Sequence, residues 1–201
     1  MKQHERWWDN SIRKQGTVDN FINTFNIPYS RRPYLTLAEN VKTFLDVGCG
    51  PALTYDFLCK NNIEVRYTGI DLCRGFIEHN KKTYPEANFV LGKSYKLPFK
   101  DKAFDFVTAR HVLEHLKEPY TTIGEMCRVS DRVAIIFFIR PQEEENITRS
   151  SKGFYKNTYS VSKLRDFIKG LGFDISTTPV YRRKTSVPGK RAKHELWSLT
   201  S

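Results

Sequence analysis

The stretch Phe44-Leu45-Asp46-Val47-Gly48-Cys49-Gly50-Pro51-Ala52 decides the fold. It has the pattern of a β-strand that ends in a glycine-containing turn and leads into a helix. Glycines in such a turn allow a sharp reversal and let a ligand approach the backbone closely. A Gly-x-Gly pair is a weak signal by itself, so its meaning depends on the residues that follow.

A carboxylate follows at the end of the next predicted strand, where Asp71 lies 21 residues after Gly50. An acid at this place can accept hydrogen bonds from both hydroxyls of a ribose. The turn and the acid together indicate a nucleoside cofactor at the carboxyl edge of a parallel sheet. The alternative is an ordinary strand, turn and helix with a chance aspartate.

The turn favours a cationic cofactor over a dinucleotide. The third glycine of the dinucleotide pattern is missing, and Asp46 places a negative charge at the mouth of the loop. That charge repels a pyrophosphate and suits a cationic ligand. A nicotinamide dehydrogenase is therefore the weaker hypothesis.

Apolar periodicity outward from this turn predicts strands alternating with helices, which is typical of a doubly wound parallel sheet. Residues 7–14 and 18–25 are expected to be helical and to belong to an N-terminal appendage, residues 1–40. Residues 41–201 are expected to form the cofactor-binding domain. Predicted strands cover residues 42–47, 65–70, 88–91, 104–108, 133–139, 173–181 and 194–200, and predicted helices cover 54–62, 74–84, 119–129 and a stretch that begins after Ser160. About eleven residues join the last two strands, which favours an antiparallel pair.

Several segments resemble the class I S-adenosylmethionine-dependent methyltransferases, specifically their type 11 subgroup. The resemblance covers about residues 42–175 and rests on a set of motifs: Asp46-Val47-Gly48-Cys49-Gly50, Asp71, residues 89–99, residues 104–107, His111-Val112-Leu113-Glu114-His115-Leu116, residues 154–159 and Gly172-Phe173. It implies a seven-stranded Rossmann-like sheet of order 3-2-1-4-5-7-6 with the last strand antiparallel. It also implies S-adenosyl-L-methionine as cofactor and S-adenosyl-L-homocysteine as product.

The resemblance assigns cofactor roles to individual residues. The amino-acid part and the turn fall to Asp46, Gly48 and Gly50, the ribose to Asp71, and the adenine to Ser94 and Tyr95, while Leu72 and Arg110 are also placed at the cofactor. One departure is Lys93, which stands where the family often has an acid that contacts the adenine amino group. Lysine cannot accept a hydrogen bond, so adenine recognition is expected to use the backbone near Ser94 and Tyr95 or the Ser94 hydroxyl.

His111 is the candidate general base, because it follows the fourth strand beside the expected position of the methyl group. The alternative is a histidine that only packs against or hydrogen-bonds the cofactor. The stretch from His111 to His115 also fits the H-x-x-E-H zinc signature. That reading needs a long helix and a third ligand, and Pro119 comes too soon after it, so no metal is expected.

The acceptor is expected to meet the N-terminal appendage and the long segment 140–159, where Trp7, Trp8, Phe154 and Tyr155 are candidate substrate-binding residues. Arg110 can orient an anionic acceptor or be a solvated charge. A small-molecule or glycan-like acceptor is favoured. The alternative is an RNA methyltransferase or nucleic-acid-binding protein that uses the cations Arg182, Arg183, Lys184, Lys190, Arg191 and Lys193 on a C-terminal hairpin.

Composition sets the remaining expectations. Of the formal net charge of +11, residues 140–201 contribute most, so the charge bears on the tail rather than on the cofactor core. The apolar runs are too short to span a bilayer, and the N-terminus has no hydrophobic signal region. The four cysteines have no C-x-x-C spacing and suit buried thiols in a reducing compartment. A cytoplasmic monomer or homodimer is expected.

Overall fold

The computed structural model describes residues 18, 22, 28–137, 141–149, 151, 155–181 and 193–201. Trp7, Trp8, Phe154, the predicted helix 7–14 and the basic linker 182–192 lie outside these residues. Val18 and Ile22, from the second predicted N-terminal helix, are both helical.

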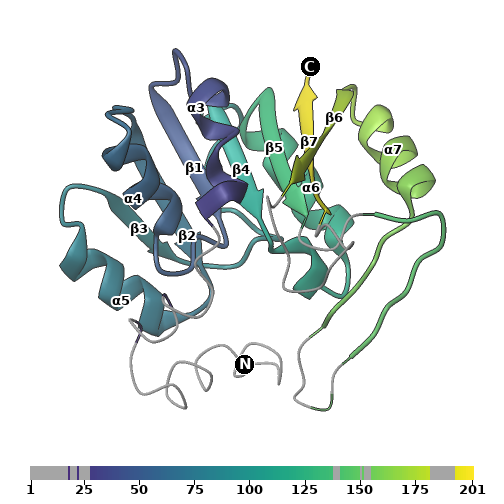
Figure 1. The fold of residues 1–201 in the computed structure, drawn as a ribbon, viewed down its shortest axis with the longest axis horizontal. Coiled ribbons are helices and arrows are strands. Elements are labelled where there is room, and N and C mark those ends of the chain that lie inside the picture. The colour runs from purple at the N-terminus through teal and green to yellow at the C-terminus, as the bar shows by residue number, and fades with distance from the viewer. Residues whose placement is uncertain are drawn as a thin grey trace.

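The chain alternates strands and helices as the periodicity predicts (Figure 1). The strands are β1 (Thr43–Val47), β2 (Arg66–Asp71), β3 (Asn88–Leu91), β4 (Phe106–Arg110), β5 (Arg132–Phe137), β6 (Asp174–Tyr181) and β7 (Lys193–Thr200). The helices are α3 (Tyr34–Leu37), α4 (Leu53–Lys60), α5 (Arg74–Thr83), α6 (Pro119–Val129) and α7 (Val161–Gly170), with short 3₁₀ turns η1 (Pro28–Arg31) and η2 (Leu113–His115).

The sheet has the order β3-β2-β1-β4-β5-β7-β6, which confirms the predicted topology. Strands β1 to β5 pair in parallel, and β7 runs antiparallel to both β5 and β6. Because the chain turns from one side of β1 to the other between β3 and β4, the carboxyl ends of β1 and β4 flank a topological switch point. In open α/β sheets this is where ligands bind.

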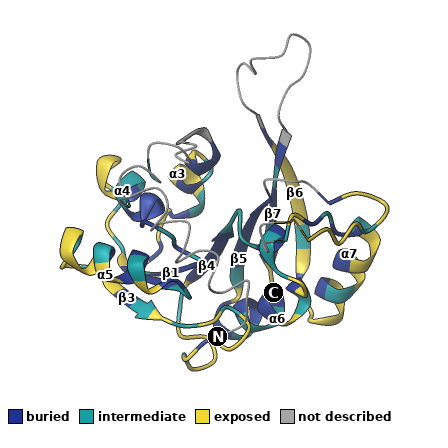
Figure 2. Cartoon of the chain, turned by 90° about the horizontal axis from the view of Figure 1, so that it is seen from below, coloured by how far each residue is buried: buried dark blue, intermediate teal, exposed yellow. Residues whose placement is uncertain are grey.

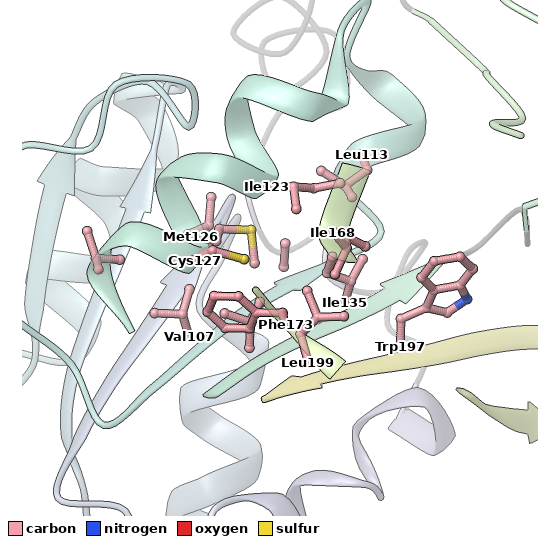
Figure 3. Packing of buried hydrophobic residues seen from close by; sticks show 14 of the residues in the cluster. Val107, Leu113, Ile123, Met126, Cys127, Ile135, Ile168, Phe173, Trp197 and Leu199 are labelled. Carbon is pink, nitrogen blue, oxygen red and sulfur yellow. The ribbon is translucent and has the colours of Figure 1, made fainter. Parts of the chain in front are cut away.

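Two apolar layers cover the sheet, one on each face. The layer of α6 and α7 includes Ile123, Met126 and Ile168, which pack against Ile135 and Trp197 of the sheet (Figure 3). The layer on the other face consists of α3, α4 and α5. The central strands are buried between them, as Figure 2 shows. Most of their residues are apolar, with Asp46 and Thr108 as buried polar exceptions.

Residues 28–38, from the predicted appendage, pack directly on this second face. Tyr34 is fully buried, and its hydroxyl lies 2.7 Å from the Oγ1 of Thr108 on β4. The N-terminal segment therefore reaches the middle of the sheet, close to the carboxyl end of β4.

Two element boundaries bear on the site. The fourth strand begins at Phe106 rather than at residue 104, because Asp105 uses its carboxylate to accept the N–H groups of Lys42 and Thr43. The strand then continues to Arg110, two residues beyond its predicted end at residue 108. Helix α7 begins after Ser160, as predicted, and the Ser160 hydroxyl caps it by accepting the N–H of Lys163.

Candidate active site

The turn after β1 is held against the end of β2 by backbone hydrogen bonds. The N–H groups of Gly48 and Cys49 both donate to the carbonyl of Ile70, at 2.8 and 3.1 Å. Gly48 and Gly50 have φ angles of +71° and +52°, in the left-handed region that favours glycine. A Cβ on Gly50 would meet nothing within 4 Å, so there is open space beside the turn.

Asp71 closes the same turn with its side chain. Its Oδ2 accepts the N–H of Gly50 and its Oδ1 accepts the N–H of Cys73, each at 2.9 Å. Burial raises the pKa of Asp71 to about 6, against the lowering effect of these two donors. Each carboxylate oxygen has a second lone pair, so the group can accept further hydrogen bonds from a ligand. Leu72 follows it, partly buried.

Asn80 on α5 also supports the turn, although no sequence pattern predicts it. The side chain is fully buried, and its Nδ2 donates to the carbonyl of Gly50 at 2.8 Å. An asparagine on a charged amphipathic helix gives no sequence signal of such a role. The turn is thus held by α5 as well as by β2.

Asp46 lies inside the protein rather than at an open mouth. It is 2% exposed, and its Oδ2 accepts the hydroxyl proton of Tyr67 at 2.8 Å. Burial raises the pKa of Asp46, against the lowering effects of Tyr67 and of the nearby Arg110 charge. Its charge acts on the site from within the second apolar layer.

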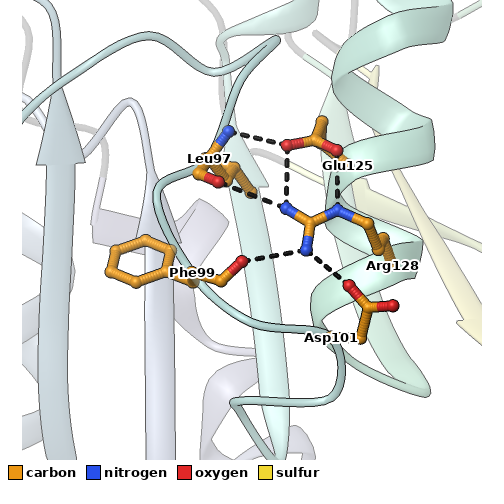
Figure 4. Close-up of polar contacts among 5 residues, drawn as sticks. All are labelled: Leu97, Phe99, Asp101, Glu125 and Arg128. Carbon is orange, nitrogen blue, oxygen red and sulfur yellow. Dashed lines mark hydrogen bonds and ion pairs between the residues drawn. The ribbon is translucent and has the colours of Figure 1, made fainter.

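The predicted adenine segment is clamped onto α6, as Figure 4 shows. The Arg128 guanidinium donates to the carbonyls of Leu97 and Phe99, at 3.2 and 2.9 Å, and Glu125 accepts the N–H of Leu97 at 2.7 Å. Glu125 also pairs with Arg128 at 2.7 Å. These bonds fix the backbone that follows the two candidate adenine residues.

The two candidate adenine residues face different surroundings. The Ser94 hydroxyl lies 3.0 Å from the Oγ1 of Thr122 on α6. Tyr95 is 41% exposed, and the Nζ of Lys93 lies 5.5 Å from the centre of its ring. The side chain that departs from the family pattern is thus exposed and packs over an aromatic ring.

A basic cluster occupies the carboxyl end of β4. The Nη1 of Arg110 lies 3.1 Å from the Oγ of Ser30 and 3.1 Å from the Nδ1 of His111. The Nε2 of His111 lies 3.1 Å from the Nδ1 of His194 on β7. Arg31, 2% exposed in η1, adds a second guanidinium. The structure thus brings Arg110 and His111 together with Ser30 and Arg31 of the N-terminal segment and with His194 of the last strand. No sequence pattern predicts Ser30 or His194 at this place.

His111 has no lone pair available for base catalysis in this arrangement. A guanidinium only donates, so the Arg110 contact occupies the Nδ1 lone pair of His111. Burial lowers the pKa of His111 well below its usual value, and the Arg110 charge adds to that effect. His111 could act as a base only after Arg110 moves away.

The two histidines of the H-x-x-E-H stretch have separate partners. The Nδ1 of His115 donates to the carbonyl of Tyr155 at 2.8 Å, whereas His111 contacts Arg110 and His194. Between them lies the short 3₁₀ turn η2 instead of the long helix that the zinc reading requires. Within the described ranges, no group of three potential metal ligands is present.

Among the candidate acceptor residues, Tyr155 alone is described. It is partly buried, and the Arg149 guanidinium lies 6.0 Å from the centre of its ring. The carbonyl of Tyr155 accepts the hydrogen bond from His115 and so ties this residue to the loop after β4. No helix in the part of the chain described here is long and apolar enough to cross a membrane.

Residues 45–138 match the family described as methyltransferase domain. An uncharacterized methyltransferase of Schizosaccharomyces pombe is 29% identical over 128 residues, covering 56% of this chain and 46% of that protein. Norajmaline N-methyltransferase of Rauvolfia serpentina is 26% identical over 184 residues, covering 89% of this chain and 59% of that protein. The chain spans about half the length of the curated relatives it matches.

Solved structures share the fold at low sequence identity. Phosphoethanolamine N-methyltransferase 2 of Haemonchus contortus has a TM-score of 0.74 at 13% identity, covering 100% of this chain and 60% of its own. A putative methyltransferase from Bacillus halodurans has a TM-score of 0.65 at 14% identity, covering 85% of this chain and 97% of its own. These similarities show a shared architecture.

Proposed function

We propose that this chain, which belongs to the class I S-adenosylmethionine-dependent methyltransferases, transfers a methyl group to a small-molecule or glycan-like acceptor that carries an anionic group. The observation that carries the proposal is the turn Gly48–Gly50 held by Asp71 at the switch point of the sheet. Relatives are named for methyl transfer to demethylmenaquinone and to norajmaline, which are small molecules.

The residues present fit S-adenosylmethionine. The space beside Gly50 is open, and Asp71 keeps lone pairs for the ribose hydroxyls. The exposed ring of Tyr95 and the backbone of the clamped segment suit an adenine, which stacks well on aromatic rings. Asp46 supplies a buried negative charge that favours a cationic ligand. When bound, the cofactor supplies an electrophilic methyl group, and S-adenosylhomocysteine is the product.

An anionic acceptor is favoured by the charges at the end of β4. Burial lowers the pKa of Arg31 to about 9, with a further lowering by the Arg110 charge, and burial also lowers the pKa of Arg110. Asp46 is a carboxylate that offsets both charges, and it is already bonded to Tyr67. Within the described residues, the Nε of Arg110 is buried without a hydrogen-bond partner. A carboxylate or phosphate of the acceptor would offset this excess positive charge.

The role of the protein is then to align the acceptor and exclude water. Arg110 orients the acceptor through its anionic group, and Tyr155 is tied to the loop after β4 through the bond of its carbonyl to His115. Trp7, Trp8 and Phe154 remain proposed acceptor contacts. We also retain a cytoplasmic location as a proposal, supported by four free thiols of which three are buried.

The test is methyl transfer from radiolabelled S-adenosylmethionine to matched pairs of small acceptors, one with a carboxylate or phosphate and one without. We expect the anionic member of each pair to be labelled preferentially. Arg110→Gln should raise the KM of the anionic acceptors and leave that of the neutral ones nearly unchanged. No transfer to any acceptor would contradict the activity, and a preference for neutral acceptors would contradict the anionic class.

The carboxylate of the cofactor is a competing anion for Arg110. If Arg110→Gln weakens S-adenosylhomocysteine binding and leaves the discrimination between acceptors unchanged, Arg110 belongs to the cofactor site, as the family resemblance implies. A control variant is Arg74→Gln, because Arg74 is exposed on α5 and lies 4.0 Å from the equally exposed Glu78.

A further inference from the structure

His194 and His111 meet from strands that are not neighbours in the sheet. His111 directly follows β4, and His194 lies on β7, with β5 between the two strands. Their rings are perpendicular, at 80°, with centres 4.8 Å apart, and the Nε2 of His111 lies 3.1 Å from the Nδ1 of His194. His194 is 2% exposed. A buried histidine in contact with a partly buried one is expected to have a defined hydrogen-bonding pattern.

The contacts determine which nitrogen of each ring carries the proton. Because Arg110 donates to the Nδ1 of His111, a neutral His111 carries its proton on Nε2. That proton faces the Nδ1 of His194, which must then be the acceptor. Each group therefore donates to the next: Arg110 donates to His111, and His111 donates to His194.

The backbone holds His111 in an unusual conformation. Its φ is +57°, a left-handed value that a residue with a Cβ adopts only at a cost. The N–H of His111 donates to the carbonyl of Ile136 on β5 at 2.8 Å. Strained backbone positions of this kind tend to occur where a side chain must be placed accurately.

We propose that His194 is a positioning residue that holds the imidazole of His111 through its Nε2–H and thereby fixes Arg110 toward the acceptor. His194 does not touch the reacting atoms. It orients His111, whose Nδ1 in turn fixes one Nη of the Arg110 guanidinium, while Ser30 accepts from the same nitrogen. The effect on catalysis rests on the proposed methyl transfer, whereas the hydrogen-bonding pattern does not.

The pattern is tested by ¹⁵N NMR of the histidine rings in the intact protein. We expect His111 to be neutral, with an unprotonated Nδ1 and an Nε2–H that is protected from exchange with water. The protected proton should disappear in His194→Phe and persist in His194→Asn, because the Oδ1 of asparagine can accept where Nδ1 does. A His111 that carries its proton on Nδ1 would overturn the proposal, and so would a proton that stays protected in His194→Phe.

Kinetics test the positioning role. His194→Phe should lower kcat/KM for an anionic acceptor about tenfold, the size expected for one buried hydrogen bond, with S-adenosylhomocysteine binding unchanged. His194→Asn should recover most of the loss, and Asp166→Asn, exposed on α7, should match the wild type. Equal losses in His194→Phe and His194→Asn, or no loss in either, would overturn the role.

The two proposals fail separately. If the wild type transfers no methyl group, the proposed function fails, while the NMR spectrum of the wild type still decides the hydrogen-bonding pattern. If His194→Phe does not fold, the tautomer of wild-type His111 and the behaviour of His194→Asn decide the proposal.

Discussion

The Oδ2 atom of Asp71 accepts the backbone N–H of Gly50 at 2.9 Å, so the acid at the end of β2 holds the turn that follows β1. Its Oδ1 also accepts the N–H of Cys73, at the start of α5. One carboxylate therefore ties together the turn, the strand and the helix around the proposed cofactor site. The protonation state of this group should control both the turn and the binding of the cofactor.

Cofactor affinity should depend on pH through Asp71. Burial raises its pKa from 3.8 to about 6 in the free protein. Ribose hydroxyls bind the ionised form, so affinity for S-adenosylhomocysteine should rise as pH rises toward 6, by at most about tenfold per unit, and then level off. Asp71→Asn should bind weakly with no such rise, since an amide has only one oxygen for two N–H donors. Calorimetry from pH 5 to 8 checks this; the same pH rise in Asp71→Asn would contradict it.

Asp71 should make the free protein less stable as pH rises, which is the opposite of its effect on cofactor affinity. Because its folded pKa is raised, the folded state binds more protons than the unfolded state between about pH 4 and 6. Asp71 therefore stabilises the fold below pH 4, and this contribution is lost as pH rises through 6. Denaturant unfolding of wild type and Asp71→Asn should give free energies whose difference changes in that window. A difference independent of pH would contradict the raised pKa.

Gly48→Ala should be much more harmful than Gly50→Ala. Both positions have positive φ, which costs alanine about 1 kcal/mol. At Gly48 the added Cβ would also lie 2.5 Å from the Cγ2 of Val112, whereas at Gly50 it meets nothing within 4 Å. We expect Gly48→Ala to lower the free energy of unfolding, measured in urea, by roughly 1–3 kcal/mol more than Gly50→Ala does. Val112→Ala should recover part of that loss; equal effects at the two glycines would contradict the close approach.

Asn80→Ala should weaken cofactor binding without contact with the cofactor. The substitution removes the donor to the Gly50 carbonyl and leaves this partly buried carbonyl without that bond. The expected loss of unfolding free energy is about 1–3 kcal/mol, accompanied by weaker S-adenosylhomocysteine binding. Asn61→Ala is the matched control, because Asn61 also donates to a backbone carbonyl but is exposed. Wild-type affinity in Asn80→Ala would show that α5 does not support the turn.

Arg128→Ala should loosen the predicted adenine segment. Arg128 bonds two carbonyls there and pairs with Glu125 and Asp101. We expect weaker cofactor binding and faster hydrogen exchange at the Leu97 amide, with a loss of roughly 1–3 kcal/mol in unfolding free energy. Lys60→Ala is the control, since it removes an exposed i,i+4 pair with Asp56 and should change stability by less than about 0.5 kcal/mol. Unchanged exchange at Leu97 would contradict the clamp.

Local patterns predicted most of the fold. Helix α6 occupies the predicted residues 119–129, and the antiparallel β6–β7 pair follows from the short connection between two apolar runs. The strand order came from the family resemblance, which the sheet confirms. Such features depend on neighbouring residues or on a recurring motif, so a single sequence can reveal them.

The site was predictable only in part, because its contacts join distant parts of the chain. Asp71 and the glycine turn carry a recognisable spacing, and the structure brings them together. Asn80 and His194 carry none, since each becomes relevant only when its element packs against the turn or β4. Asp46 illustrates the converse: its sequence position suggested an open mouth, but strand alternation directs its side chain into the second apolar layer.

The most direct test of the account is calorimetric titration of the protein with S-adenosylhomocysteine, comparing wild type, Asp71→Ala and Asp174→Ala. Asp174 lies exposed at the start of β6 and serves as the matched control. We predict saturable binding to one site in wild type and in Asp174→Ala. In Asp71→Ala we predict that binding is lost or is weaker by about tenfold or more. No binding to the wild type, or unchanged binding in Asp71→Ala, would contradict the assignment of the cofactor to the turn that Asp71 holds.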